Sequence, residues 1–261
     1  MNILDTIVAR KKLEVAERKQ KLSVADLEKG KFFASPTLSL KSFLQNENKT
    51  GIIAEYKRKS PSKGIINDKA TVEEVTTAYA KYGASGISVL TDTHFFGGSL
   101  DDLLAATINE VPLLRKDFMI DEYQLIEAKA FGAEVILLIA ACLTPTEVKT
   151  MAATAKGLGL EVLLEIHNDA ELGHICDAVD LVGVNNRNLK TFEVSIDASL
   201  GLINKIPKDK PAVAESGISD VDTIVTLREA GFKGFLIGEN FMKQASPSIA
   251  FADFVNQLKA K

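Results

Sequence analysis

From Gly51 onward the chain repeats one pattern eight times, a short apolar run followed by an amphipathic stretch, and this repeat constrains its fold most strongly. Near-continuous apolar runs are typical of parallel strands covered by helices. The strand candidates are residues 52–56, 86–90, 111–115, 133–140, 160–166, 180–185, 211–215 and 234–238. The helix candidates are residues 72–82, 100–109, 122–131, 146–157, 170–176, 198–204, 221–230 and 248–259. Eight such units in 261 residues predict an α/β fold, a closed (β/α)8 TIM barrel rather than an open doubly wound sheet.

Residues 1–48 precede the first strand candidate and carry a helical pattern of their own. Ile3, Leu4 and Ile7 recur near helical spacing among charged residues, and two shorter helices are expected after them. We therefore expect residues 1–261 to form a single barrel domain, with residues 1–48 as an N-terminal helical extension. The extension is expected to cover one mouth of the barrel, and a direct role in substrate binding is the less favoured alternative.

Composition limits the classes of partner. The net charge of −4 shows no basicity that would favour nucleic acid, and no polybasic tail points to a membrane surface. Cys142 and Cys176 lack metal-ligand spacing and are expected to be reduced packing residues of a cytoplasmic protein. Residues 2–22 are too charged for a signal peptide, and the apolar run 135–143 is too short to cross a bilayer. We expect a monomer that acts on a small molecule, with no pathway partner indicated.

Charged side chains follow the first strand candidate. Glu55 and Lys57 are two residues apart, so both leave the same face of the strand. A buried unpaired charge is unfavourable, and an opposite charge beside it offsets part of that cost. Lys59 and Lys63 in the next loop make it attractive to anions. Taken alone, the segment is equally compatible with a polar site and with a structural ion pair beside a solvated turn.

Other strand candidates also end in polar groups. Active sites of such barrels lie at the carboxyl ends of the strands, which all meet at one mouth. Lys116, Glu165, Asn185 and Arg187 lie at or just beyond the ends of the third, fifth and sixth candidates. A lysine there can act as a general acid, and glutamates can hold lysines or move protons. Each residue alone could form an ion pair at the rim, but seven strand ends that supply such groups favour an active site.

Two glycine-containing turns follow the last two strand candidates. They are Ser216-Gly217 and Gly238-Glu239, at the place where many barrels bind phosphate through backbone amides. Either turn alone is a weak signal, because glycines routinely end strands, but together they predict a phosphate site. The acidic side chain of Glu239 is expected to turn away, so that its backbone amide does the binding.

Aromatic and histidine side chains fall near the same mouth. Phe95, Phe96 and Phe118 could be ordinary loop packing or an apolar wall for an aromatic substrate, and the charged groups beside them favour the wall. His94 and His167 are expected to be structural or peripheral, because no third ligand indicates a metal site. We expect no metal.

A family resemblance rests on motifs that occur in the family's order along nearly the whole chain. The segment IIAEYKRKSPSKG at 52–64 is highly specific. The others are LLRKDF at 113–118, LLEIH at 163–167, GVNNRNL at 183–189, AESGI at 214–218 and FLIGENFM at 235–242. The chain therefore resembles indole-3-glycerol phosphate synthase, an enzyme of tryptophan biosynthesis.

The resemblance implies a carboxy-lyase that uses no cofactor. Its substrate would be 1-(2-carboxyphenylamino)-1-deoxyribulose 5-phosphate, and its products indole-3-glycerol phosphate, carbon dioxide and water. Attack of an aromatic carbon on a ketone requires an acid at the developing alkoxide, and the later decarboxylation and dehydration require further proton transfers. A phosphate anchor supplies binding energy away from the reacting atoms.

The resemblance also implies catalytic roles. Lys116 resembles the general acid that protonates the ketone oxygen, with Glu165 as its acid/base partner. Lys57 resembles a second proton donor that faces the substrate carboxylate, and Glu55 resembles the carboxylate that positions it and acts as a base in dehydration. The division of acid steps between the two lysines stays open, because they are expected to lie close enough to couple.

The remaining implied residues bind the substrate. Asn185 and Ser216 complete the implied catalytic set, and Asn185 and Arg187 resemble substrate-orienting groups. The implied phosphate-binding residues are Lys59, Ser216, Gly217, Gly238 and Glu239. The implied substrate-binding residues are Lys59, Ser60, Phe95, Phe118, Arg187, Leu189 and Leu236, of which Phe118 and Leu189 resemble walls of the anthranilate pocket.

Two alternatives rank lower. Phosphoribosylanthranilate isomerase is also a phosphate-binding barrel, but it needs a Cys/Asp acid–base pair, and neither Cys142 nor Cys176 is at the expected first-strand position. A non-catalytic barrel that binds a sugar phosphate or serves as a scaffold has no need to bury the charged groups at the strand ends.

Overall fold

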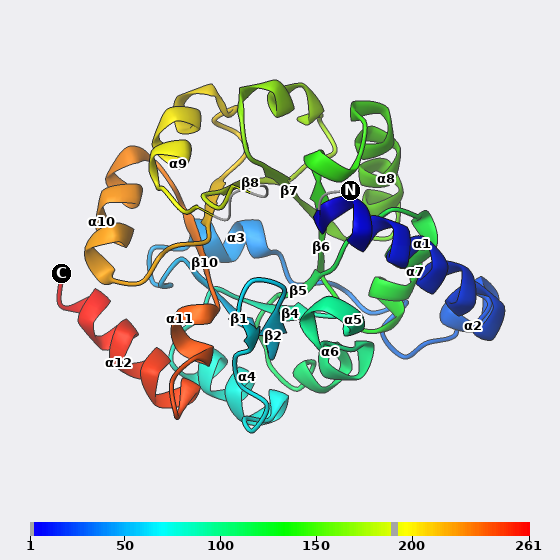
Figure 1. Ribbon diagram of the computed structural model, residues 1–261, viewed down its shortest axis with the longest axis horizontal. Coiled ribbons are helices and arrows are strands. Elements are labelled where there is room, and N and C mark those ends of the chain that lie inside the picture. Colours follow the sequence, from blue (N-terminus) through cyan, green and yellow to red (C-terminus); the bar gives the residue numbers. More distant parts are fainter. Residues whose placement is uncertain (1–2, 189–192) are drawn as a thin grey trace.

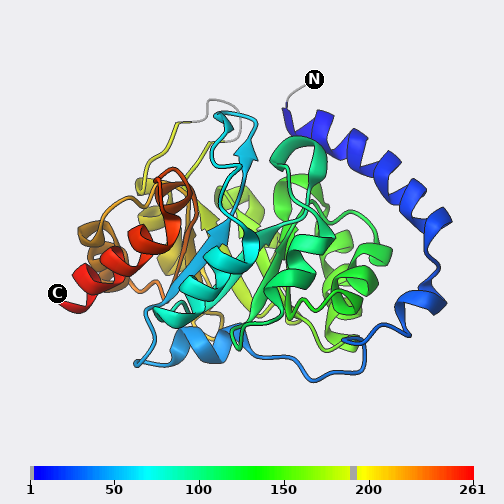
Figure 2. The same ribbon diagram turned by 90° about the horizontal axis from the view of Figure 1, so that it is seen from below.

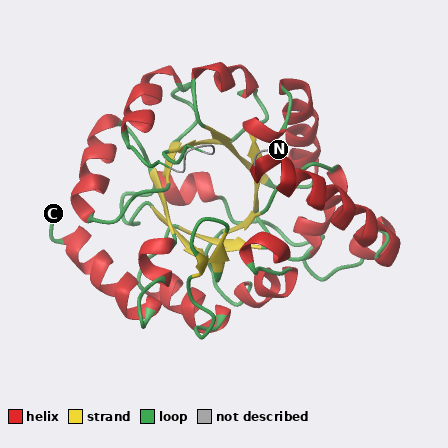
Figure 3. Ribbon diagram, in the orientation of Figure 1, coloured by secondary structure: helices red, strands yellow, loops and turns green. Residues whose placement is uncertain are grey.

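Eight parallel strands close into a barrel in the computed structural model, which describes residues 3–188 and 193–261. Around the barrel the strands follow the order β1-β10-β9-β8-β7-β6-β5-β4, and helices surround them (Figure 1, Figure 3). The strands are β1 (Ile52–Tyr56), β4 (Gly86–Leu90), β5 (Leu113–Lys116), β6 (Val135–Ile139), β7 (Glu161–Ile166), β8 (Leu181–Asn185), β9 (Ala212–Glu215) and β10 (Gly234–Ile237). The predicted (β/α)8 barrel is therefore confirmed.

The strand register places the polar strand ends at one level. Leu90 pairs with Lys116, and Asn185 pairs with Glu215, so the last residues of neighbouring strands lie beside each other. All five residues of β1, β4 and β6 are buried, because one face packs into the barrel interior and the other packs against helices. The carboxyl ends of the strands thus form a single rim.

Helices cover the outside of the barrel in the predicted order. They are α4 (Val72–Lys81), α6 (Leu100–Ala106), α7 (Glu122–Ala130), α8 (Pro145–Gly157), α9 (Asp197–Leu202), α10 (Val221–Ala230) and α12 (Pro247–Lys259). The helix predicted at 170–176 is instead the 3₁₀ helix η2 (Asp169–His174), which starts where Asn168 accepts a hydrogen bond from the Ala170 amide. A 3₁₀ helix is favoured in such short pieces, and Gly173 weakens any longer α-helix there.

Several short elements were not predicted as separate elements. Helices α5 (Thr93–Phe96) and α11 (Glu239–Met242) follow β4 and β10, and the small strands β2 (Lys59–Ser60) and β3 (Gly64–Ile65) pair in the loop after β1. The remaining short helices are η1 (Ala140–Cys142) and η3 (Ile203–Lys205). Such segments are shorter than the window over which a hydrophobic period can be recognised.

The N-terminal extension reaches both ends of the barrel, whereas the prediction placed it at one mouth. It comprises α1 (Ile3–Lys21), α2 (Val24–Leu27) and α3 (Leu40–Gln45). Helix α1 lies beside the carboxyl-end rim, and α3 lies at the opposite end (Figure 2). Leu40 and Leu44 of α3 join the apolar cluster inside the barrel, together with Ile53 and Leu114. The extension therefore closes the bottom of the barrel interior with apolar side chains.

A buried ionic network attaches α1 to the barrel. The Lys11 ammonium lies 2.9 Å from Asp92 and 2.8 Å from Asp117, the residues that follow β4 and β5. Arg115 lies 3.1 Å from Asp117 and 2.8 Å from Glu127 on α7. Because buried charges are stable only when paired, these contacts fix the position of α1 over the rim. No helix within the described ranges is long and apolar enough to cross a membrane.

Candidate active site

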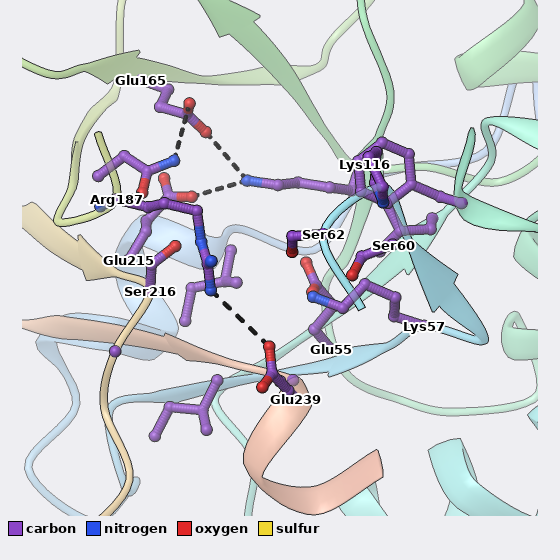
Figure 4. Close-up of a pocket in the computed structure, with 18 of the residues that line it drawn as sticks. Glu55, Lys57, Ser60, Ser62, Lys116, Glu165, Arg187, Glu215, Ser216 and Glu239 are labelled. Atoms are coloured by element: carbon purple, nitrogen blue, oxygen red, sulfur yellow. Dashed lines mark hydrogen bonds and ion pairs between the residues drawn. The ribbon is translucent and has the colours of Figure 1, made fainter. Parts of the chain in front are cut away.

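A cavity of about 640 Å³ opens at the carboxyl ends of the strands. All eight barrel strands or the turns after them supply residues to its lining, and α1 adds Ile3, Leu4 and Ile7. The extension therefore forms part of the cavity wall. A direct role of the extension in substrate binding, the less favoured alternative, stays a prediction. Figure 4 shows many of the charged side chains that face this space.

Lys116 forms the centre of the charged cluster. Its Nζ lies 3.1 Å from Glu165 Oε2 and 2.7 Å from Glu215 Oε2 (Figure 4). Asn185 donates a hydrogen bond of 3.1 Å from Nδ2 to Glu165 Oε1. One ammonium from β5 is thus held between carboxylates from β7 and β9, and the Asn185 amide orients the first of them.

The balance of burial and charge determines the protonation of this cluster. Burial alone would lower the pKa of Lys116, but the charges of Glu215 and Glu165 outweigh it and raise that pKa. Burial alone would raise the pKa of Glu165, but Lys116 and His167 outweigh it and lower that pKa. Burial raises the pKa of Glu215 to about 7, because Lys116 offsets it only in part and the Glu165 charge opposes ionisation. The cluster therefore combines a firmly held ammonium with a carboxyl group that titrates near neutrality.

Glu215 lines the cavity but was not among the predicted site residues. It ends β9 and is almost fully buried, and one of its oxygens, Oε1, has no hydrogen-bond partner among the described residues. Its sequence signal matches that of Glu55 and Glu165, a glutamate at the end of an apolar strand. Only the Ser216-Gly217 turn after it was predicted to belong to the site.

Glu55 and Lys57 form the predicted pair beside this cluster. Lys57 Nζ lies 2.8 Å from Glu55 Oε1, and both residues line the cavity. Two glycines make room for the rim carboxylates. A Cβ at Gly238 would lie 2.7 Å from Glu55 Oε1, and a Cβ at Gly183 would lie 2.1 Å from Glu215 Oε1. The glycines of these motifs thus permit glutamates to lie against the neighbouring strand.

The predicted phosphate turns line the same cavity. Ser216 has a φ of 69° and Gly217 a φ of 76°, so consecutive residues adopt the left-handed conformation. That conformation is uncommon for a serine and is found mainly at functional sites, where the surrounding structure holds it. Gly238 and Glu239 at the start of α11 also line the cavity. The Glu239 carboxylate faces it and lies 3.7 Å from Arg187 and 3.9 Å from Lys63.

Other predicted site residues are divided between the cavity and its surroundings. Ser60, Phe118, Arg187 and Leu236 line the cavity. Lys59 does not, because its Nζ donates a 2.6 Å hydrogen bond to the His94 carbonyl instead of pointing to the phosphate turns. Phe95 is also absent from the lining, where the neighbouring Phe96 is found. Leu189 lies outside the described residues.

His167 was expected to be structural or peripheral, and it lies against the charged cluster around Lys116. Its Nε2 is 3.3 Å from Glu165 Oε1, a close ionic contact without hydrogen-bond geometry. Its Nδ1 is 3.4 Å from Glu171 Oε2. Burial would lower the pKa of His167, but the two carboxylates outweigh it and raise the pKa to about 10. The imidazole is therefore a second cation beside Glu165. Among the described residues, no group of three acidic, histidine or cysteine side chains is placed to hold a metal ion.

A closed parallel barrel with paired lysines and carboxylates at the carboxyl-end rim defines a (β/α)8-barrel enzyme equipped for acid–base chemistry. The sequence matches the family model for indole-3-glycerol phosphate synthase over residues 4–254. The chain belongs to the indole-3-glycerol phosphate synthase family, whose activity is that of a carboxy-lyase in tryptophan biosynthesis.

Individual relatives agree with this assignment. An indole-3-glycerol phosphate synthase from Bacteroides thetaiotaomicron is 46% identical over 259 residues, which cover 99% of each chain. Another, from a Polaromonas species, is 42% identical over 256 residues, covering 96% of this chain and 97% of the relative. The family assignment excludes both the isomerase and the non-catalytic barrel.

Solved structures show the same fold in more distant proteins. A tryptophan synthase α-subunit from Pyrococcus furiosus superposes with a TM-score of 0.62 at 16% identity, covering 82% of this chain and 99% of that one. The α-subunit from Legionella pneumophila gives a TM-score of 0.62 at 13% identity, covering 85% and 95%. At this identity the likeness is one of fold.

Proposed function

We propose that Lys116 is the general acid of ring closure in the conversion of 1-(2-carboxyphenylamino)-1-deoxyribulose 5-phosphate to indole-3-glycerol phosphate. The observation that carries the proposal is the position of its ammonium between Glu165 and Glu215 in the cavity. The ammonium protonates the ketone oxygen as the aromatic carbon attacks, so the developing alkoxide never stands unprotonated. Glu165, oriented by Asn185, acts as its acid/base partner.

Lys57 and Glu55 are proposed to serve the later steps. Their 2.8 Å contact holds the Lys57 ammonium at the cavity, where it can face the substrate carboxylate before carbon dioxide leaves. Loss of hydroxide then needs one proton donor and one base, and an ammonium paired with a carboxylate supplies both. The division of acid steps between Lys57 and Lys116 belongs to this proposal.

The two ends of the substrate are proposed to bind to different walls. The phosphate binds the turns at Ser216-Gly217 and Gly238-Glu239, supported by their place after β9 and β10 and by the Ser216 backbone conformation. The anthranilate ring lies against Phe118 and Leu236. Binding energy from both ends then orients the reacting carbon and ketone.

The domain organisation and location complete the proposal. Residues 1–261 act as one barrel domain with residues 1–48 as its extension, as the contribution of α1 and α3 to the two ends supports. We also propose a monomer in the cytoplasm, supported by free thiols at Cys142 and Cys176.

The test of Lys116 is a kinetic one. We expect Lys116→Ala to lose turnover by roughly 10²–10⁴-fold while KM changes little, because a general acid acts mainly in the transition state. Product formation can be followed by indole fluorescence, and thermal unfolding shows whether the variant is folded. Turnover within a few fold of the wild-type value would contradict the assignment.

Glu165→Gln tests the partner role in the same assay. We expect kcat to fall severely with the substrate still bound. A comparable loss confined to KM would instead identify Glu165 as a binding residue.

A further inference from the structure

The phosphate end of the cavity holds an acidic side chain among basic ones. Lys63, Arg187 and Lys243 line the cavity with Glu239. Glu239 Oε2 lies 3.7 Å from the Arg187 guanidinium, and Glu239 Oε1 lies 3.9 Å from the Lys63 ammonium. The side chain therefore does not turn away from the site, as the sequence analysis expected. It faces the cations that an incoming phosphate would contact (Figure 4).

The ion pairs of Glu239 with Arg187 and Lys63 can be exchanged for contacts with another anion. The side chains of Arg187, Glu239 and Lys63 are 25%, 34% and 56% exposed, so water can replace any contact that is broken. Exposed ion pairs at such distances contribute little to stability. By contrast, the cluster around Lys116 is buried and its contacts are shorter. The charged side chains at the phosphate end of the cavity are thus loosely paired, and those around Lys116 are firmly paired.

The contacts also connect three elements of the rim. Lys63 comes from the β2–β3 hairpin, Arg187 follows β8, and Glu239 opens α11. Their side chains meet at Glu239. An anion that entered between Lys63 and Arg187 would make the same pairings with more charge, and a carboxylate left in place would repel it.

We propose that the Glu239 carboxylate is an internal anion that occupies the cationic part of the phosphate site in the empty enzyme and is displaced by the phosphate group of the substrate. This inference rests on the proposed function, because it requires the phosphate to bind at these turns. Substrate binding is then an exchange of anions at Arg187 and Lys63. The exchange lowers affinity for phosphate groups, so that product bearing the same phosphate is released more readily.

Inorganic phosphate is the probe for this exchange. Its inhibition constant against substrate would be measured for the wild-type enzyme and for Glu239→Gln at constant ionic strength. We expect Glu239→Gln to bind phosphate about 3–30-fold more tightly and to show a lower KM, from the loss of two exposed ion pairs and one repulsion. Glu229→Gln, which removes one charge near the end of α10 at the far side of the barrel, should leave the inhibition constant unchanged.

Arg187→Gln completes a double-mutant cycle. If Glu239 acts by pairing with Arg187, Glu239→Gln should change the inhibition constant of phosphate less in the Arg187→Gln variant than in the wild-type enzyme. Equal or weaker phosphate binding by Glu239→Gln would overturn the inference while leaving the phosphate site in place. Absence of competition by phosphate in both the wild-type enzyme and Glu239→Gln would overturn the proposed phosphate site itself, and the inference with it.

Discussion

At the scale of single residues, the charged cluster at the rim is one ammonium shared by two buried carboxylates. Lys116, His167 and Asn185 together outweigh burial and lower the pKa of Glu165, whereas burial and the neighbouring Glu165 charge raise the pKa of Glu215 to about 7. His167 adds a cation on the far side of Glu165. The ionisation of each group depends on all of its neighbours, and a substitution at one of them should change the titration of the others.

The first prediction concerns Glu215. Because burial raises its pKa to about 7, we expect kcat of the wild-type enzyme to change with pH around that value. Glu215→Gln cannot ionise, so this inflection should disappear from a profile measured between about pH 5 and 9. A variant that kept the inflection at the same pH would show that another group titrates there.

The second prediction concerns the charge of His167. Its pKa is raised to about 10, so its ring should remain an imidazolium at pH 8. Proton–nitrogen NMR of the three histidines can show this, with His167→Gln to assign the signal. Glu171→Gln removes one of the two carboxylates and should lower the measured pKa. A neutral ring at pH 8 would contradict the prediction.

The raised pKa of His167 also sets the sign of a stability effect. A group whose pKa is higher in the folded protein than in the unfolded chain stabilises the folded state. This stabilisation is complete below the pKa of the unfolded state, near 6.5 for histidine, and is lost as the pH rises through the pKa of the folded state. The free energy of unfolding should therefore fall between about pH 6.5 and 10. Thermal unfolding of His167→Gln should show a smaller fall over this range.

At the scale of secondary-structure elements, two strands carry glycines that make room for carboxylates on their neighbours. Gly183 lies in β8 and faces the Glu215 side chain, and Gly238 follows β10 and faces Glu55. Parallel strands lie so close together that a Cβ at either position would meet a side chain that the site requires. The elements and the catalytic residues are thus fitted to one another.

Gly183→Ala tests this fit. The added Cβ would lie 2.1 Å from Glu215 Oε1, so the carboxylate must move away from Lys116. We expect a loss of roughly 1–3 kcal/mol in the free energy of unfolding and a large loss of kcat. Gly201→Ala in α9 is the matched control, because no atom lies within 4 Å of its added Cβ. Equal stability of the two variants in urea unfolding would argue against the proposed fit.

At the scale of the whole molecule, the extension connects the two ends of the barrel. Helix α3 fills the bottom of the interior, while α1 supplies part of the cavity wall at the top. The Lys11 network attaches α1 to the loops after β4 and β5, beside Lys116. The same helix therefore lines the cavity and carries the ion pairs that attach the extension to the rim.

Lys11→Met tests the attachment of α1. The substitution leaves Asp92 and Asp117 buried without their ammonium partner, and breaking such a pair typically destabilises a protein by roughly 3–5 kcal/mol. Lys12→Met, at the exposed neighbouring position, should change stability by about 0.5 kcal/mol at most. Urea unfolding compares the two variants, and similar midpoints would show that the network does not hold α1.

The amino-acid sequence predicted the barrel, the order of its elements and many of the residues that line the cavity. Apolar periodicity is a local property, and the parallel barrel brings every strand end to one rim, so Glu55, Lys116 and Glu165 could be placed there without coordinates. Tertiary structure alone decided which charges pair. It joined Glu215 to Lys116, directed Lys59 to a backbone carbonyl and placed His167 against Glu165. The direction and protonation of a side chain depend on neighbours distant in the chain, because Coulomb attraction and burial act through space.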